Sequence, residues 1–195
     1  MALPDPIITW RTSDNSASMS TWTVNDTNGG TVDAGVTPPS ATAKTILVWN
    51  NYASGGTENT DVKDAYNLRI ISTDVNGNVN ATDTPELIQN DWILIKCNSL
   101  SETTATAIGR DNSNPSLPIY HPISAVGTTT NTAGTFTVAT PNPTDNTTYK
   151  LLGCKNTGAT SNLANFSNIT LSASIPTNAT GGNYSFLVKC LYLHV

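Results

Sequence analysis

The sequence predicts an all-β fold, an antiparallel β-sandwich of about 8–10 strands with turns at the spacing typical of that architecture. Charged residues make up 12% of the 195-residue chain, against ~25% in an average protein. Thr, which favours strands, and Asn, Gly and Pro, which favour turns, are abundant instead. Apolar residues recur at every second position in short segments, and no segment has a convincing helical period. Such regular apolar strands also argue against disorder.

The predicted strands are short apolar segments separated by turn-forming residues. In chain order they are Ile7–Trp10, Ser20–Val24, Lys44–Asn50, Ala65–Thr73, Trp92–Cys97, Thr135–Thr140, Thr147–Cys154, Ile169–Ile175 and Tyr184–Leu193. The centre of Lys44–Asn50 is almost continuously apolar, which indicates burial on both faces of its sheet. Trp92–Cys97 alternates instead, so that Ile93, Ile95 and Cys97 share one face.

The last two predicted strands are the most legible part of the chain. The turn-forming segment Pro176–Asn183 joins them, which predicts an antiparallel hairpin. The second strand becomes apolar on both faces toward its end, so we expect it to be central in its sheet, or covered by another layer or another chain. Leu187, Leu191 and Leu193 share the face of Ser185 and Lys189 and therefore mark a possible contact surface.

We expect a single domain over residues 1–195, with a short N-terminal arm (1–10) and a long loop (98–132). The loop is rich in proline and has only scattered apolar residues. Loops longer than ~12–15 residues in compact domains are usually functional or disordered. The arm and the loop are therefore predicted to make inter-subunit contacts. The residues predicted for these contacts are Ile7, Ile8, Trp10, Pro115, Leu117, Pro118, Ile119, Tyr120, His121 and Pro122.

Composition also disfavours several classes of protein. The net charge is −5 and no Lys/Arg cluster occurs, so a nucleic-acid partner is not expected. No apolar run approaches the ~18 residues of a membrane helix, and the N-terminus lacks the features of a signal peptide, so synthesis in a cytoplasm is expected. Cys97, Cys154 and Cys190 are widely spaced and odd in number, which indicates buried free thiols.

No motif predicts catalysis. Histidine is the commonest general base, and the chain has only His121 and His194, with no G-x-S-x-G segment. A Ser-His-Asp triad assembled from distant segments has no local signature here. We therefore expect a protein that is not an enzyme, without catalytic residues, metal or cofactor.

Two acidic segments invite comparison with calcium sites. Asp74 begins an Asp-x-Asn-x-Asn pattern like that of a calcium loop. However, Val79 and Pro85 occupy the positions at which a calcium loop has Gly and Glu. A hairpin turn is therefore the better interpretation. Glu58, Asp61 and Asp64 could supply oxygen ligands, although a solvated loop is the simpler interpretation.

The tryptophans allow a second interpretation. Trp22, Trp49 and Trp92 fall in predicted strands and are expected in the core, while Trp10 lies near the start. Exposed aromatic rings beside polar groups would instead suggest sugar binding, because polar loops on β scaffolds often carry binding sites.

Several segments together resemble the Ig-like β-sandwich domains found in small structural proteins of tailed phages and prophages of Gram-positive, especially clostridial, bacteria. The segments are Pro4–Trp10, Thr31–Gly35 with Pro38-Pro39, Ile46–Asn51, Asp61–Ala65 and Ile175–Tyr184. The resemblance spans most of the chain but not residues 103–132, and no catalytic or ligand-binding residue carries over from it.

The resemblance implies a non-enzymatic virion structural protein. Within that class we expect a capsid decoration (auxiliary head) protein, attached to the shell in many copies and made in the host bacterial cytoplasm. Its partners would be other virion proteins, the major capsid protein above all, and copies of itself, because symmetry multiplies a modest interface. The alternatives are a tail or baseplate component, and a carbohydrate- or host-surface-binding module.

Overall fold

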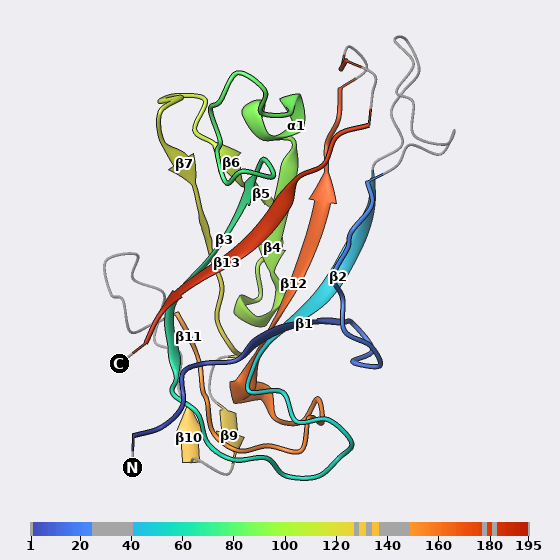
Figure 1. Cartoon of the computed structure of the whole chain (residues 1–195). Coiled ribbons are helices and arrows are strands. Elements are labelled where there is room, and N and C mark those ends of the chain that lie inside the picture. Colours follow the sequence, from blue (N-terminus) through green and yellow to red (C-terminus); the bar gives the residue numbers. More distant parts are fainter. Residues whose placement is uncertain are drawn as a thin grey trace.

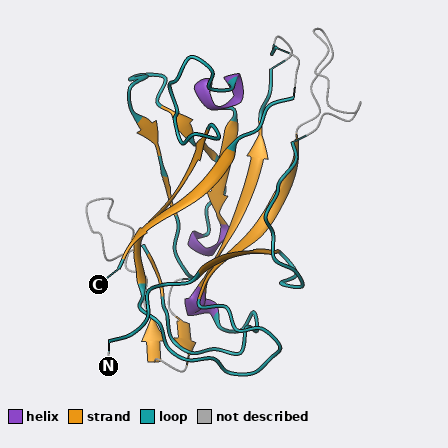
Figure 2. Ribbon diagram, viewed as in Figure 1, coloured by secondary structure: helices purple, strands orange, loops and turns teal. Residues whose placement is uncertain are grey.

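The computed structural model describes residues 2–24, 41–126, 129–131, 134–136, 149–176, 179–180 and 183–194. Its elements are β1 (Ile8–Thr12), β2 (Ala41–Asn50), β3 (Ala65–Thr73), α1 (Glu86–Gln89), β4 (Ile93–Cys97), η1 (Asn98–Leu100), β5 (Thr106–Ala107), β6 (Gly109–Arg110), β7 (Pro118–Ile119), β8 (His121–Pro122), β9 (Thr129–Asn131), β10 (Gly134–Phe136), β11 (Lys150–Leu151), η2 (Leu163–Asn165), β12 (Phe166–Ala173) and β13 (Leu187–Leu193). Strands make up nearly all of the regular secondary structure in this part of the chain (Figure 2), which confirms the all-β prediction.

Two antiparallel sheets face each other (Figure 1). Sheet A has five strands in the order β1-β2-β12-β4-β5. In sheet B, β3 is the central strand, with β13 along one edge and β8 and β11 along the other. These must be opposite edges, because the β3 residues that pair with β8 or β11 also pair with β13. Two further short pairs join β6 to β7 and β9 to β10. The arrangement is sandwich-like, and the Ig-like assignment remains a prediction.

One hydrophobic core joins the two sheets. Ile95 and Ile169 of sheet A belong to the same buried cluster as Leu68 and Ile70 of sheet B. The predicted alternation in β4 is confirmed, because Ile93, Ile95 and Cys97 are all fully buried. At ~25 cal/mol per Å² of apolar surface, burial of such side chains is the main stabilising term of the fold.

The prediction that the strand Lys44–Asn50 is buried on both faces is also confirmed. Ile46 and Val48 of β2 face the core between the sheets. Leu47 and Trp49 face outward and form a second cluster with Phe166. Trp49 therefore lies outside the core between the sheets, although it is completely buried.

The predicted closing hairpin is wrong. β12 pairs with β2 and β4 in sheet A, whereas β13 pairs with β3 in sheet B. β13 begins at Leu187 rather than Tyr184, and it lies at the edge of its sheet rather than at the centre. The alternating pattern specifies a strand with one buried face, but the same pattern suits a crossing to the opposite sheet.

The described part of the segment predicted as one long loop (98–132) contains five short strands, β5 to β9, and a 3-10 turn. β5 extends sheet A and β8 pairs with β3 of sheet B. Ile108 and Ile123 of this segment are fully buried in the core. The apolar residues of this segment therefore contribute to the core, although they have no regular period in the sequence.

Other predictions differ in detail from the structure. Ser20–Val24 is not a strand, and the connection near residue 86 contains the helix α1. Asp74 closes a turn by accepting the backbone N–H groups of Asn76 and Asn78, but this turn leads toward α1 rather than into a second hairpin strand. The resemblance segment 31–39, and most of the predicted strand 135–140 with residues 147–148, lie outside the described residues.

Candidate functional site

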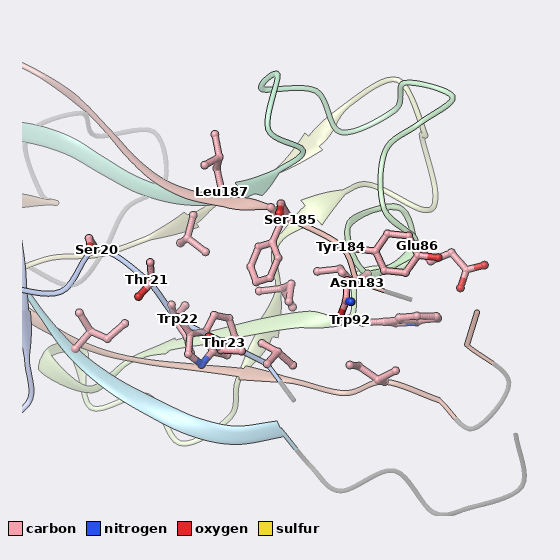
Figure 3. A pocket seen from close by; sticks show the side chains of 18 of the residues that line it. Ser20, Thr21, Trp22, Thr23, Glu86, Trp92, Asn183, Tyr184, Ser185 and Leu187 are labelled. Atoms are coloured by element: carbon pink, nitrogen blue, oxygen red, sulfur yellow. The ribbon is translucent and has the colours of Figure 1, made fainter. Parts of the chain in front are cut away.

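An open groove of about 680 Å³ lies between the start of β13 and the segment Met19–Val24 (Figure 3). Ile93 of β4 and Leu171 of β12 lie on its floor and are almost fully buried. The groove exists because sheet B ends at β13, while sheet A continues through β2 to β1. Side chains, rather than a further strand, cover this part of the inner face of sheet A.

The walls of the groove are aromatic and aliphatic. Trp22 and Phe186 face each other edge to face, with ring centroids 5.9 Å apart and planes at 82°. Both rings, together with Met19 and Val188, are half-buried and pack against the core. Such aromatic pairs prefer this geometry because the positive ring edge meets the negative ring face.

One end of the groove is polar. The Glu86 carboxylate accepts the Thr180 hydroxyl at 2.7 Å and the Thr180 backbone N–H at 3.0 Å. These two hydrogen bonds lower the pKa of Glu86, so its carboxylate stays charged. Trp92 and Tyr184 lie at the same end (Figure 3). Among the described residues that line the groove, Glu86 alone carries a charge.

The backbone beside the groove has no described pairing partner on two sides. β13 makes its ladder with β3 on one side, and no described strand pairs with its other edge. Within the described part of the chain, Ser20–Val24 also makes no backbone hydrogen bond to another segment. Unpaired strand edges can pair with another chain, which gives this groove polar as well as apolar binding groups.

A second exposed feature lies on the outer face of β13. Val188, Cys190 and Tyr192 point toward the core, so the intervening side chains point outward. Leu187 is 38% exposed and Leu193 is 52% exposed. We call Leu187, Leu191 and Leu193 the leucine stripe.

The leucine stripe lies on the strand that pairs with Arg69 of β3. The Arg69 guanidinium lies 4.9 Å from the centre of the exposed Tyr120 ring. Arginine and tyrosine are both enriched in protein interfaces, whereas lone exposed leucines are common on any surface. The combination makes the outer face of sheet B a candidate contact surface.

A partly buried network around His121 connects the two sheets at their other edge. His121 Nδ1 lies 2.7 Å from the Thr106 hydroxyl, and His121 Nε2 lies 2.9 Å from Glu102 Oε2. The same Glu102 oxygen accepts the backbone N–H of Cys97 at 2.6 Å. Burial lowers the pKa of His121 more than the Glu102 carboxylate raises it.

The order hydroxyl, imidazole, carboxylate resembles a catalytic triad. Here, however, the Glu102 carboxylate also holds the turn after β4, and none of these three residues lines the groove. The network ties β5 of sheet A to β8 of sheet B through the contact between Thr106 and His121.

The residues predicted to contact other subunits do not form one surface. Ile8 and Trp10 lie in β1 and pack against the core, whereas Ile7 is 52% exposed. In the 98–132 segment, Pro115, Leu117 and Tyr120 are exposed, Pro118, Ile119 and Pro122 are half-buried, and His121 is buried. The N-terminus and the β6–β7 hairpin lie at opposite ends of the molecule (Figure 1). The contact prediction itself remains a prediction.

The acidic residues near the start of β3 bind neighbouring loop residues by hydrogen bonds and one ion pair. Asp61 accepts the N–H of Lys155 at 2.7 Å and Asp64 accepts that of Gly153 at 2.8 Å. Glu58 forms an ion pair with Lys155. Across the described ranges, no group of three or more His, Cys, Asp or Glu side chains is arranged to hold a metal ion.

The groove was not predicted from the sequence. Trp22 and Trp92 were expected in the core, because a tryptophan in an apolar segment is usually buried. The hydroxyl residues around Trp22 in Ser20–Thr23 were the available signal that this segment lies at a surface.

Comparisons of the chain with models of protein families, with curated proteins and with solved structures give no match. No helix in the described ranges is long and apolar enough to cross a membrane.

Proposed function

We propose that this chain is a non-enzymatic structural protein of a phage particle, and specifically a capsid decoration protein attached to the shell in many copies. The observation that carries the assembly role is the leucine stripe on β13, where Leu187 and Leu193 are 38% and 52% exposed. The resemblance of the sequence supports the assignment to a virion.

The leucine stripe suits docking on a repeated surface. Burying a leucine side chain contributes roughly 1.5–3 kcal/mol, so each copy would gain a modest affinity. Many identical sites on a symmetric shell then give stable decoration without a large interface. The major capsid protein is the proposed partner, and neighbouring copies of this chain would meet on the same lattice.

The test is incorporation into particles. Changing Leu191→Ser and Leu193→Ser together should reduce the copies per particle at least about tenfold, because loss of 1.4 kcal/mol already lowers binding tenfold. The matched control is Val75→Ser, which alters an aliphatic residue that is 56% exposed on a turn. Unchanged incorporation of the double variant would remove the leucine stripe as the docking surface.

Copy number separates the two structural roles. Quantitative mass spectrometry of purified particles should find on the order of hundreds of copies, as expected when a modest interface is repeated by shell symmetry. A number on the order of ten would instead assign the chain to the tail or baseplate. Absence from the particles altogether would contradict the virion role.

A further inference from the structure

Sheet B is narrower than sheet A. Sheet A has five strands side by side. Across sheet B the described strands fill three positions, because β8 and β11 both pair with the edge of β3 that β13 leaves free. No described strand lies next to the other edge of β13, and the groove lies beside this edge.

The two chain segments beside the groove leave backbone groups unpaired. In the described part of the chain, neither the free edge of β13 nor Ser20–Val24 has a backbone partner. Natural proteins often protect such edges with lysines or bulges. β13 has Lys189 and an irregularity near Leu191/Leu193, both beyond the groove. At the groove itself, Leu187 and Val188 have no such protection.

We infer that the groove binds an extended peptide segment of another protein, which adds a strand beside β13. Main-chain hydrogen bonds to the strand edge would supply affinity, and alternate side chains would enter the groove, as in other cases of strand addition. Those side chains would cover Trp22, Phe186 and Val188, which are half-buried in the free chain.

The lining indicates the chemistry of this peptide. The groove walls are mostly aromatic and aliphatic, so alternate residues of the peptide would be apolar. Glu86 is the single charged residue among the described residues that line the groove, so a Lys or Arg of the peptide fits beside it. A saccharide suits the groove less well, because Thr180 already donates two hydrogen bonds to the Glu86 carboxylate and the floor is aliphatic.

This inference does not rest on the proposed virion role. Leu187 of the leucine stripe also lines the groove, whereas Leu191 and Leu193 do not. Changes at Leu191 and Leu193 therefore test docking on the shell, and a change at Ser185 tests the groove.

The test is a selection from a displayed library of random peptides of about nine residues, which span ~30 Å when extended. The full chain is the target, and the variant Ser185→Arg serves for counter-selection, because Ser185 is exposed and lines the groove. The matched control is Ser116→Arg, an exposed serine outside the groove. Thermal unfolding verifies that both variants fold.

The expected peptides alternate apolar and polar residues and carry a basic residue near one end. They should bind the unchanged chain and Ser116→Arg equally, and Ser185→Arg at least about tenfold more weakly. Hydrogen exchange should show protection of β13 amides, and N-methylation of alternate peptide amides should abolish binding, because it removes strand hydrogen bonds.

Three results would overturn the inference. One is enrichment of no peptide over the Ser185→Arg counter-selection. Another is binding that N-methylation leaves unchanged. The third is glycan-array binding that Ser185→Arg abolishes, since this would assign the groove to a saccharide.

Discussion

His121 and Glu102 form a partly buried contact between the two sheets, with His121 Nε2 2.9 Å from Glu102 Oε2. The imidazole belongs to β8 of sheet B, and the carboxylate follows β4 of sheet A. His121 is 6% exposed, whereas the Glu102 side chain is 27% exposed. Protonation of His121 should therefore affect how firmly the sheets are held together.

Stability should fall as the pH falls below about 6.5. Burial lowers the pKa of His121 below its ordinary value of 6.5, so the unfolded chain binds this proton more readily than the folded chain does. The stability that neutral His121 contributes is fully present above its ordinary pKa of 6.5. It is lost as the pH falls through the lower pKa that His121 has in the folded chain. Urea unfolding between pH 5 and pH 8 measures it, in the range where histidine titrates. His121→Gln should abolish this part of the pH dependence, whereas the exposed His194→Gln should not.

Gly158→Ala should destabilise the fold strongly. The φ angle of Gly158 is +73°, and an added Cβ would overlap the backbone oxygen of Ala53. Gly56 has the same φ of +73°, but nothing lies within 4 Å of its added Cβ. Gly56→Ala should therefore lose only the roughly 1–3 kcal/mol of left-handed backbone strain, and Gly158→Ala clearly more. Equal losses in chemical denaturation would contradict the overlap.

Asn156→Asp should destabilise the loops at the end of sheet A. Asn156 Nδ2 donates to the backbone oxygen of Asn51 at 2.8 Å, and its Oδ1 accepts the N–H of Gly158 at 2.9 Å. An aspartate keeps the shape but places a charged acceptor against the Asn51 carbonyl. The loss should exceed the about 1–3 kcal/mol of an unsatisfied buried group. The exposed Asn114→Asp should change the free energy of unfolding by less than about 0.5 kcal/mol.

Arg11→Lys should lower the free energy of unfolding, although it keeps the positive charge. The Arg11 guanidinium lies 3.8 Å from the centre of the Tyr52 ring and donates to Asn15 Oδ1 at 2.8 Å and to the Asn15 backbone oxygen at 2.7 Å. Lysine cannot stack and donate in this fork. The expected loss is about 1–2 kcal/mol, from the cation–π contact and one hydrogen bond. Arg110→Lys is the control, because its contacts are longer, at 3.4 Å.

Individual strands were predictable where local pattern and burial agree. β3 has the predicted bounds, Ala65–Thr73, and β4 begins one residue after the predicted start at Trp92. Both have large apolar residues on a face that the core must cover. Ser20–Val24 has a similar local pattern, but it pairs with no described strand, and its residues line the groove.

The candidate site was less predictable than the strands. The outward direction of Leu187 and Leu193 follows from alternation along β13, and the prediction of a possible contact surface there used only that alternation. The groove requires Met19–Val24 and Asn183–Val188 to lie on either side of the β4 and β12 inner face. These segments are far apart in the sequence, so no local pattern could place them together.

The sequence by itself determined that the chain is all-β, that one face of β4 lies in the core, and that Cys97 and Cys154 are buried free thiols. Cys190, which was also predicted to be buried, is only half-buried. The correct predictions depend on composition and on a period of two, which are local. The tertiary structure decided that β12 and β13 belong to different sheets, that His121 joins those sheets, and that no described strand pairs with the edge of β13 beside the groove. Strand pairing depends on contacts between distant residues, and many pairings satisfy the same local alternation.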